Sequence, residues 1–256
     1  MQKNYLDYKK IPIKKSWGQN FLIDENIIKK IIKIINPNEN STIIEIGPGK
    51  GALTIPISKI AKKVYAVEVD PLLYEFLKTK NIKNICLYNE DILKWNFDGN
   101  HDKNVTIIGN LPYYISSPII FKFLNTNYWK DMIIMVQKEV GKRITSKHKS
   151  KDYSRISVMC QTFFKTKYIC DISKNVFIPK PKVSSSILSF QRKKTTINIE
   201  KYSAFIKIAF SNRRKTIKNN FKKHIDVELL NGFKNKRADE ITVDEYKKLF
   251  NKIYLM

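Results

Sequence analysis

Cysteine and histidine are scarce in this chain, and their placement excludes several kinds of site. Three cysteines and three histidines are scattered over 256 residues, and no two cysteines have the CxxC spacing of a zinc or redox site. An odd, dispersed set of cysteines also argues against a disulfide framework. We therefore expect no metal site and no structural disulfide.

Long apolar runs are missing too. No stretch approaches the roughly 20 apolar residues that a membrane helix needs, and no apolar N-terminal segment is bounded by charge and a cleavage site. We expect a soluble, cytoplasmic protein that makes no membrane contact. The apolar fraction of 43%, with 12% aromatic residues, predicts a packed globular fold rather than a disordered chain.

Acidic residues are the scarcer charged group, with 23 Asp and Glu against 48 Lys and Arg and a formal net charge of +25. Such a surface attracts polyanions and releases their counterions, so nucleic acid is the first partner to consider. A mutational bias toward Lys, Asn and Ile would raise the charge without selection for binding. The placement favours binding, because residues 191–223 carry eleven Lys and Arg against the single acid Glu200.

Apolar periodicity predicts the fold class. Isoleucines recur at helical spacing after Asp24 until Pro37, and beyond it short apolar runs alternate with helix-length segments. The runs are Thr42–Ile46, Val64–Val69, Asn84–Leu87, Val105–Ile108 and Met132–Val136, followed by Tyr168–Ile172 and Ser185–Phe190. This order predicts an α/β fold of the Rossmann-like kind, a mostly parallel, doubly wound sheet whose last two strands form an antiparallel edge.

The C-terminal part reads as a small helical domain with a basic surface. After the polar stretch Gln191–Asn198, apolar residues from Tyr202 to Phe210 follow a helical pattern, basic residues line a second predicted helix, and a third covers Val243–Ile253. We expect a larger domain over residues 1–192 and the helical domain over 193–256. Arg214, Lys218 and Lys222 are expected on one face of the second helix, and these three together with Arg213 and Lys215 are the expected nucleic-acid contacts. For each, a solvated helix face explains the charge as well as a nucleic-acid contact does.

A glycine-rich turn follows the first strand of the alternating region. Gly47, Gly49 and Gly51 lie where that strand ends and a helix begins. Glycines let the backbone approach a ligand closely, and open α/β sheets bind small molecules at the carboxyl ends of their strands. A dinucleotide would fit such a turn equally well, and a purely structural role in strand-to-helix packing stays open.

Two acidic residues indicate which kind of ligand the site would bind. Glu68 ends the second strand about twenty residues after the glycines, where a carboxylate accepts hydrogen bonds from both ribose hydroxyls. Asp91 follows the third strand and is placed to accept from the amine of an adenine ring. Together the two acids describe an adenosine pocket, although either one alone is equally well explained as a surface acid at a strand end.

The segment Asn110-Leu111-Pro112-Tyr113 follows the fourth strand at the same edge. The amine of adenine is a poor nucleophile because its lone pair is delocalised into the ring. The Asn110 side-chain oxygen and a backbone carbonyl at Leu111 or Pro112 would accept the two amine hydrogens and stabilise the positive charge that develops during attack on a methyl donor. Tyr113 offers a face on which the base would stack. A tight proline turn with a packed tyrosine is the alternative.

These residues resemble a known family, the KsgA-type ribosomal RNA adenine dimethyltransferases. The resemblance runs from Trp17 to about Phe250. The blocks that carry it are Gly18–Leu22, Glu45–Leu53, Glu68–Asp70, Asp91, Gly109–Ser117, Phe177–Ser185 and Ala209–Thr216. So many blocks in one order make the match specific.

The resemblance implies a function and further site residues. It implies dimethylation of two adjacent adenines near the 3′ end of small-subunit ribosomal RNA, within an assembling particle, by a monomeric enzyme that uses S-adenosyl-L-methionine. The positions that match the family's cofactor site are Asn20, Leu22, Gly47, Glu68, Asp91 and Asn110. The resemblance places Asn110, Tyr113 and Phe177 around the target base. The roles of Asn20, Leu22 and Phe177 rest on similarity alone.

One residue differs from the family pattern, and three alternative functions stay open. Tyr114 stands where the family usually has asparagine, which puts the number of methyl groups added in doubt. An Erm-type enzyme, which methylates a large-subunit adenine, is the nearest rival, but the Arg213–Thr216 block and the Phe177–Val183 turn look more like the first group. A non-catalytic assembly or transcription factor of the same fold is a second rival. A nicotinamide dehydrogenase would leave the Asn110–Tyr113 segment and the charge unexplained.

Overall fold

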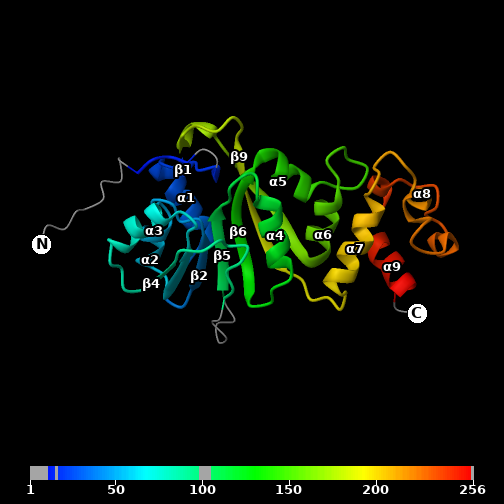
Figure 1. Cartoon of the computed structure of the whole chain (residues 1–256), viewed down its shortest axis with the longest axis horizontal. Helices are drawn as coiled ribbons and strands as arrows, with labels where there is room; N and C mark the ends of the chain where they lie inside the picture. Colours follow the sequence, from blue (N-terminus) through cyan, green and yellow to red (C-terminus); the bar gives the residue numbers. More distant parts are fainter. Residues whose placement is uncertain (1–10, 15–16, 98–104, 255–256) are drawn as a thin grey trace, which may run out of the picture. The chain divides into compact units, whose positions relative to one another are not determined.

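The computed structural model describes residues 11–14, 17–97 and 105–254 (Figure 1). The chain forms two compact units, Met1–Lys138 with Ile169–Ser189, and Glu139–Tyr168 with Phe190–Met256. The second unit therefore adds residues 139–168 and 190–192 to the helical region expected over 193–256. The division into domains at residue 192 stays a prediction.

A seven-stranded sheet runs through the α/β part. Its strands are β2 (Thr42–Ile46), β3 (Lys63–Val67), β4 (Ile85–Tyr88), β5 (Val105–Asn110), β6 (Trp129–Gln137), β7 (Phe164–Ile172) and β9 (Ser185–Arg192). The order is β4-β3-β2-β5-β6-β9-β7, and the pairs β4-β3, β3-β2, β2-β5 and β5-β6 are parallel. β9 and β7 form the antiparallel edge. The expected α/β fold is confirmed, and Figure 1 shows β2, β5 and β6 side by side.

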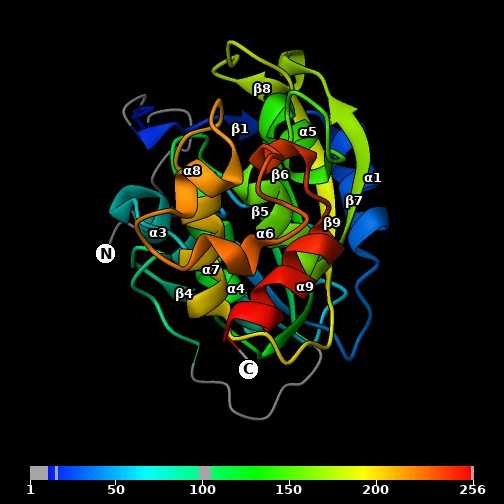
Figure 2. The ribbon, with the colours of Figure 1, turned by 90° about the vertical axis from the view of Figure 1, so that its right-hand side faces the viewer.

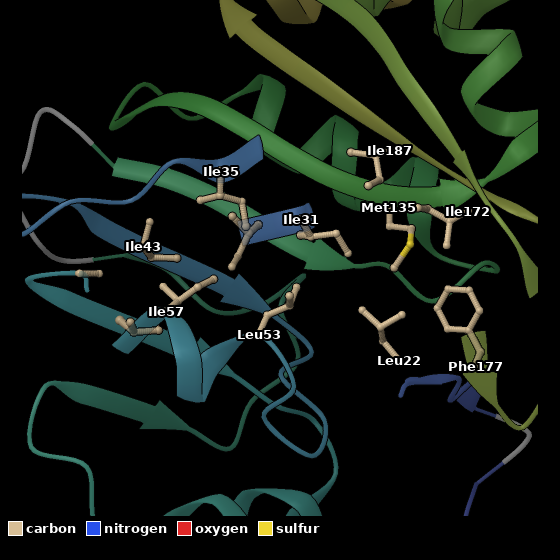
Figure 3. Packing of buried hydrophobic residues seen from close by; sticks show 13 residues of the cluster. Leu22, Ile31, Ile35, Ile43, Leu53, Ile57, Met135, Ile172, Phe177 and Ile187 are labelled. Carbon is tan, nitrogen blue, oxygen red and sulfur yellow. The ribbon is translucent and has the colours of Figure 1, made fainter. Parts of the chain in front are cut away.

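One face of the sheet is covered by α1 (Glu25–Ile35) and α2 (Thr54–Ser58). The Asp24 side chain caps α1 by accepting from the Ile27 amide at 2.9 Å, as the sequence predicts. Figure 3 shows Ile31 and Ile35 of α1 in one apolar cluster with side chains of β2, α2, β6 and β9. Each isoleucine buried in this way stabilises the fold by roughly 1.5–3 kcal/mol.

The opposite face carries aromatic side chains. Successive residues of a strand point to opposite faces, and Tyr65 of β3 therefore points away from the apolar cluster that contains its neighbour Val64. Its ring centroid lies 5.0 Å from that of Phe97. Helix α4 (Ser116–Leu124) is tied to the same segment, because the Lys122 ammonium donates to the Trp95 carbonyl. Helix α3 (Pro71–Lys78) lies between β3 and β4 in the chain.

A second, two-stranded sheet joins distant segments of the first unit. β1 (Phe21–Leu22) pairs antiparallel with β8 (Phe177–Ile178), and Leu22 lies opposite Phe177 in the register. The 3-10 turn η3 (Lys174–Val176) precedes β8. The sequence predicts a turn over Phe177–Val183, but its first two residues form a strand that pairs with β1.

The second unit is mostly helical. Its elements are α5 (Lys138–Thr145), which begins at the last residue of the first unit, α6 (Arg155–Phe163), α7 (Ile199–Ala209), α8 (Ile217–Phe221), η4 (Val227–Leu230), η5 (Ala238–Glu240) and α9 (Val243–Tyr254). Aromatic rings from three helices meet in its core. The ring centroid of Phe205 on α7 lies 5.0 Å from that of Phe221 on α8 and 5.6 Å from that of Phe250 on α9. Figure 2 shows α9 against α7. Across the described ranges, every helix is too short or too polar to cross a membrane.

The helix α8 is shorter than expected. We expected Arg214, Lys218 and Lys222 on one helical face, but α8 covers Ile217–Phe221 alone, so Arg214 lies in the loop before it. The Asn220 side chain explains why the loop replaces the first part of the expected helix. Its Nδ2 donates to the Ala209 carbonyl at the end of α7 at 2.7 Å and to the Asn212 carbonyl in the loop at 3.1 Å. These bonds hold the chain between α7 and α8 in a closed turn that a longer helix would open.

Replacing Asn220 with alanine tests this account. The variant removes the side-chain donor to the buried Ala209 carbonyl at the end of α7, whereas the Asn212 carbonyl keeps a bond from the Lys215 amide. We expect a loss of about 1–3 kcal/mol in the free energy of unfolding, measured by urea denaturation. The matched control is Asn219→Ala, since that neighbouring side chain is exposed. Equal stability of the Asn220 and Asn219 variants would contradict the structural role.

Candidate active site

The first unit contains a cavity of about 400 Å³ beside the carboxyl ends of β2, β3 and β5. Its walls come from an N-terminal segment at residues 17–23, the glycine turn, the end of β3 and the segment that follows β5. Nine of the residues predicted from the sequence line it: Asn20, Leu22, Gly47, Gly49, Glu68, Asn110, Leu111, Pro112 and Tyr113. Residues that lie up to 93 positions apart in the chain therefore share one cavity.

The glycine turn forms one wall of the cavity. Gly47 has φ 64°, and a Cβ placed there would meet no atom of the described residues within 4 Å, so these residues leave the space beside this backbone open. Gly49 has φ 58° and donates its amide to Oε2 of Glu68 at 3.0 Å. Both glycines occupy the left-handed region, which residues with a Cβ rarely adopt. The turn thus exposes backbone to the cavity and is hydrogen-bonded directly to Glu68, the acid that follows β3.

Glu68 is an almost fully buried carboxylate. It is 5% exposed, and its Oε1 accepts from the Asp70 amide at 2.9 Å while Oε2 accepts from Gly49. Burial raises the pKa of this carboxyl, although the backbone hydrogen bonds oppose the shift. Each carboxylate oxygen has about two acceptor sites. Capacity therefore remains for hydroxyl donors from a ligand in the cavity.

Asp70 anchors the N-terminal wall. Its side chain is fully buried and accepts from the Lys14 ammonium at 2.9 Å and from the Gln19 amide at 2.8 Å. Burial disfavours the charged form, but the Lys14 and Gln19 hydrogen bonds, together with one from the Leu72 amide, outweigh it and hold the pKa of Asp70 below its ordinary value. The segment that carries Asn20 is thus held by contacts to a buried carboxylate.

Asn110 connects the same wall to the end of β5. Its Nδ2 donates to the Asn20 carbonyl at 2.8 Å. Within the described ranges, the side-chain oxygen of Asn110 has no hydrogen-bond donor, and the same holds for the carbonyl of Leu111. The Pro112 carbonyl is already engaged by the Ile115 amide at 3.2 Å. Of the two backbone carbonyls considered from the sequence, the one at Leu111 therefore keeps its acceptor capacity.

Tyr113 lies beside these acceptors with its ring half-buried. Its hydroxyl forms a hydrogen bond with the Ser185 hydroxyl at 2.9 Å. Burial raises the pKa of this phenol, and the hydrogen bond opposes the shift. The ring is thus held at its far end, which leaves it in place as part of the cavity wall.

Two predicted residues lie outside the cavity lining. Asp91 is partly exposed, and its Oδ1 accepts from the Leu93 amide at 2.9 Å. Phe177 is 2% exposed and packs in the apolar cluster with Leu22, Met135 and Ile172, as Figure 3 shows. Neither side chain lines the cavity, although Phe177 lies opposite Leu22, which does, and their assigned roles stay predictions.

Glu45 lines the cavity but received no role from the sequence. It belongs to β2, is 3% exposed, and its Oε2 has no partner among the described residues. Burial raises the pKa of its carboxyl to about 7, with the Thr54 hydroxyl opposing and the charge of Glu68 reinforcing the shift. The available signal was a lone acid within an otherwise apolar strand, since buried acids are rare. Among the residues that the structure describes, no group of three or more His, Cys, Asp or Glu side chains is arranged to hold a metal ion.

The sequence is similar over most of its length to a protein family and to named proteins. The family model described as ribosomal RNA adenine dimethylase matches residues 11–254. The protein named "Ribosomal RNA small subunit methyltransferase A" from Wigglesworthia glossinidia brevipalpis is 44% identical over 257 residues, covering 95% of this chain and 98% of its own. The protein of the same name from Mycoplasmopsis pulmonis is 44% identical over 248 residues, covering 93% and 97%.

Solved structures agree with the fold. A dimethyladenosine transferase from Plasmodium falciparum has a TM-score of 0.80 and 26% identity, covering 90% of this chain and 95% of its own. The 23S rRNA methyltransferase ErmE has a TM-score of 0.70 and 22% identity, covering 91% and 99%. The second likeness is one of fold alone.

The buried Glu45 carboxyl predicts a pH dependence of stability. Its pKa is about 7 in the folded chain against 4.5 in an exposed one, so between these values the folded state binds more protons than the unfolded state. The stabilising contribution of the neutral form is complete below pH 4.5 and is lost as the pH rises to about 7. As the pH rises from 4.5 to about 7, we expect the free energy of unfolding of the wild type to fall by up to about 3 kcal/mol relative to that of Glu45→Gln.

Urea denaturation of both proteins at several pH values between 4.5 and 8 measures this difference. Glu39→Gln provides the control, since that side chain is exposed. Parallel pH curves for the wild type and Glu45→Gln would show that the carboxyl is solvated in solution.

Proposed function

The chain belongs to the ribosomal RNA adenine dimethylase family, and from this membership we propose its reaction. The protein transfers methyl groups from S-adenosyl-L-methionine to the exocyclic amines of two adjacent adenines near the 3′ end of small-subunit ribosomal RNA, with a role in small-subunit biogenesis. One observation carries the proposal: the Asn110 amide lines the same cavity as the glycine turn, and its oxygen keeps its acceptor capacity within the described chain.

The cavity fits the cofactor in size and charge. S-Adenosyl-L-methionine, when bound, supplies an electrophilic methyl group on a sulfonium, and it carries two positive groups and an adenosine. Two buried acidic side chains, Glu45 and Glu68, line the cavity, and Glu45 has an oxygen without a partner among the described residues. The open space beside Gly47 would be reduced by any Cβ. Cofactor contacts at Asn20, Leu22, Gly49, Glu68 and Asp91 complete the proposed set.

Methyl transfer requires the protein to orient the adenine amine and does not require a side chain that removes a proton from it. The Asn110 oxygen and the Leu111 carbonyl accept the two amine hydrogens, so that the nitrogen lone pair faces the methyl group. Pro112 fixes the backbone between Leu111 and Tyr113, and the Tyr113 ring stacks on the base. Phe177 would complete the base pocket, which requires its side chain to leave the apolar cluster where the structure places it.

Ribosomal RNA is the partner, and the basic C-terminal surface supports its binding. Arg214, Lys215, Lys218 and Lys222 are exposed. Arg213 differs, because its guanidinium donates to the carbonyls of Ser150 and Lys151 within the second unit. We assign phosphate contacts to the first four and a mainly structural role to Arg213. A monomer acting on a pre-ribosomal particle in the cytoplasm completes the proposal.

Replacing Asn110 with alanine tests the assignment of the amine-binding group. The lost contacts act mainly on the developing charge, so kcat should fall about 10²–10³-fold, as on removal of one oxyanion-hole donor. The dissociation constant for S-adenosyl-L-methionine should rise less than about tenfold, because only the bond to Asn20 is lost on that side. Calorimetry and methyl transfer to undermethylated small-subunit particles measure the two quantities.

The matched control is Asn26→Ala, an exposed asparagine on α1. An Asn110→Ala protein with wild-type kcat would refute the proposed catalytic role. Absence of S-adenosyl-L-methionine binding by the wild type would favour a non-catalytic RNA-binding protein of the same fold. Transfer to protein-free large-subunit RNA in preference to small-subunit particles would favour the Erm-type reaction.

The RNA surface is tested by replacing Arg214, Lys218 and Lys222 together with glutamine. Binding should weaken, and the slope of log affinity against log salt should flatten by up to ~0.7 for each lost phosphate contact. The control replaces Lys29, Lys30 and Lys33, three exposed lysines of α1, and changes the net charge equally. Equal slopes for the two triple variants would mean that only total charge matters.

A further inference from the structure

A second tyrosine lies beside the proposed base pocket and has no part in the reaction described above. Tyr114 is 61% exposed, the largest exposed fraction among the large apolar and aromatic side chains of the described ranges. Its neighbour Tyr113 lines the cavity and is held by Ser185, whereas Tyr114 does not line it. The Tyr113 ring thus forms part of the cavity wall, whereas the Tyr114 ring lies on the open surface at the rim of the cavity.

The backbone fixes where the Tyr114 ring lies. The Ile115 amide donates to the Pro112 carbonyl at 3.2 Å, which closes a turn with Tyr113 and Tyr114 at its two central positions. The Ser116 hydroxyl donates to the Tyr113 carbonyl at 3.2 Å and closes the next step of the chain. A ring in the middle of such a turn projects outward, and its anchoring backbone has little freedom to move.

The ring is also supported from one side. A Cβ on Gly18 would lie 3.3 Å from Cδ1 of Tyr114 and 3.4 Å from Cε1, so the ring packs closely beside the Gly18 backbone. Gly18 itself lines the cavity. The exposed aromatic surface therefore adjoins the cavity mouth and is partly immobilised before any ligand binds.

We propose that the ring of Tyr114 is a stacking platform for the nucleotide next to the target adenine. The proposal rests on the proposed function and adds a substrate-positioning residue to it. A base that enters the cavity leaves its neighbour at the rim, where an exposed aromatic face offers sequence-tolerant stacking. The turn places this platform one residue from Tyr113, so the two rings hold consecutive bases. The high positive charge of the chain favours RNA over a protein partner at this surface.

The experiment compares Tyr114→Ala, Tyr114→Leu and Tyr114→Phe in methyl transfer to reconstituted, undermethylated small-subunit particles. We expect the alanine and leucine variants to raise the KM for particles about five- to a hundredfold, the range of one stacking contact. Tyr114→Phe should keep the wild-type KM. For all three variants kcat at saturating particles and the dissociation constant for S-adenosyl-L-methionine should stay unchanged, which also reports that the variants are folded.

A second substrate separates stacking from a structural role. In these particles the nucleotide beside the target adenine is abasic, introduced by ligation of a synthetic 3′ segment. The penalty of Tyr114→Ala should then vanish, because the contact that it removes is already missing. A penalty that persists on abasic particles would overturn the proposal and indicate a protein contact or a structural role. If the wild type methylates particles and Tyr114→Ala does so with the same KM, the proposal alone fails; if the wild type methylates none, the proposed function fails.

Discussion

The hydrogen bond from Asn110 Nδ2 to the Asn20 carbonyl is the contact on which the site depends. It directs the amide nitrogen to the N-terminal wall, so that the oxygen is left as the acceptor. Without this bond, an amide could present either a donor or an acceptor, and a donor would repel the amine of adenine. The contact also joins two segments that are 90 residues apart, so one interaction both orients the Asn110 amide and connects two walls of the cavity.

Much of this arrangement was predictable where the determinants are local. The strand Thr42–Ile46 was predicted with the bounds that the structure has, because all five residues are buried and a glycine turn ends the run. The helix after Asp24 begins where its cap predicts. The cavity positions at Gly47, Glu68 and Asn110 followed from the rule that parallel strands end at one edge.

Contacts between distant segments were not predictable from the chain alone. β1 and β8 have two residues each, too few for any periodicity, and they form only as partners. Asp70 carries a visible signal as the cap of α3, but its bond to Lys14 depends on how the N-terminal segment folds back. Glu45 is similar: an acid in an apolar strand is visible, whereas the missing partner of its Oε2 is a property of the assembled cavity. Phe177 was placed by resemblance, and its burial reflects its pairing with Leu22.

The acidic character of the cavity has a consequence for turnover. Although the chain has a net charge of +25, the cavity is lined by two buried carboxyl groups, those of Glu45 and Glu68, and burial raises the pKa of each. In its ionised form such a carboxyl attracts a sulfonium, and this attraction disappears once the sulfur has become a neutral thioether, since Coulomb energy requires charge on both partners. Under the proposed assignment of this cavity to the cofactor, the ionised carboxyls therefore hold the spent cofactor less tightly than the methyl donor.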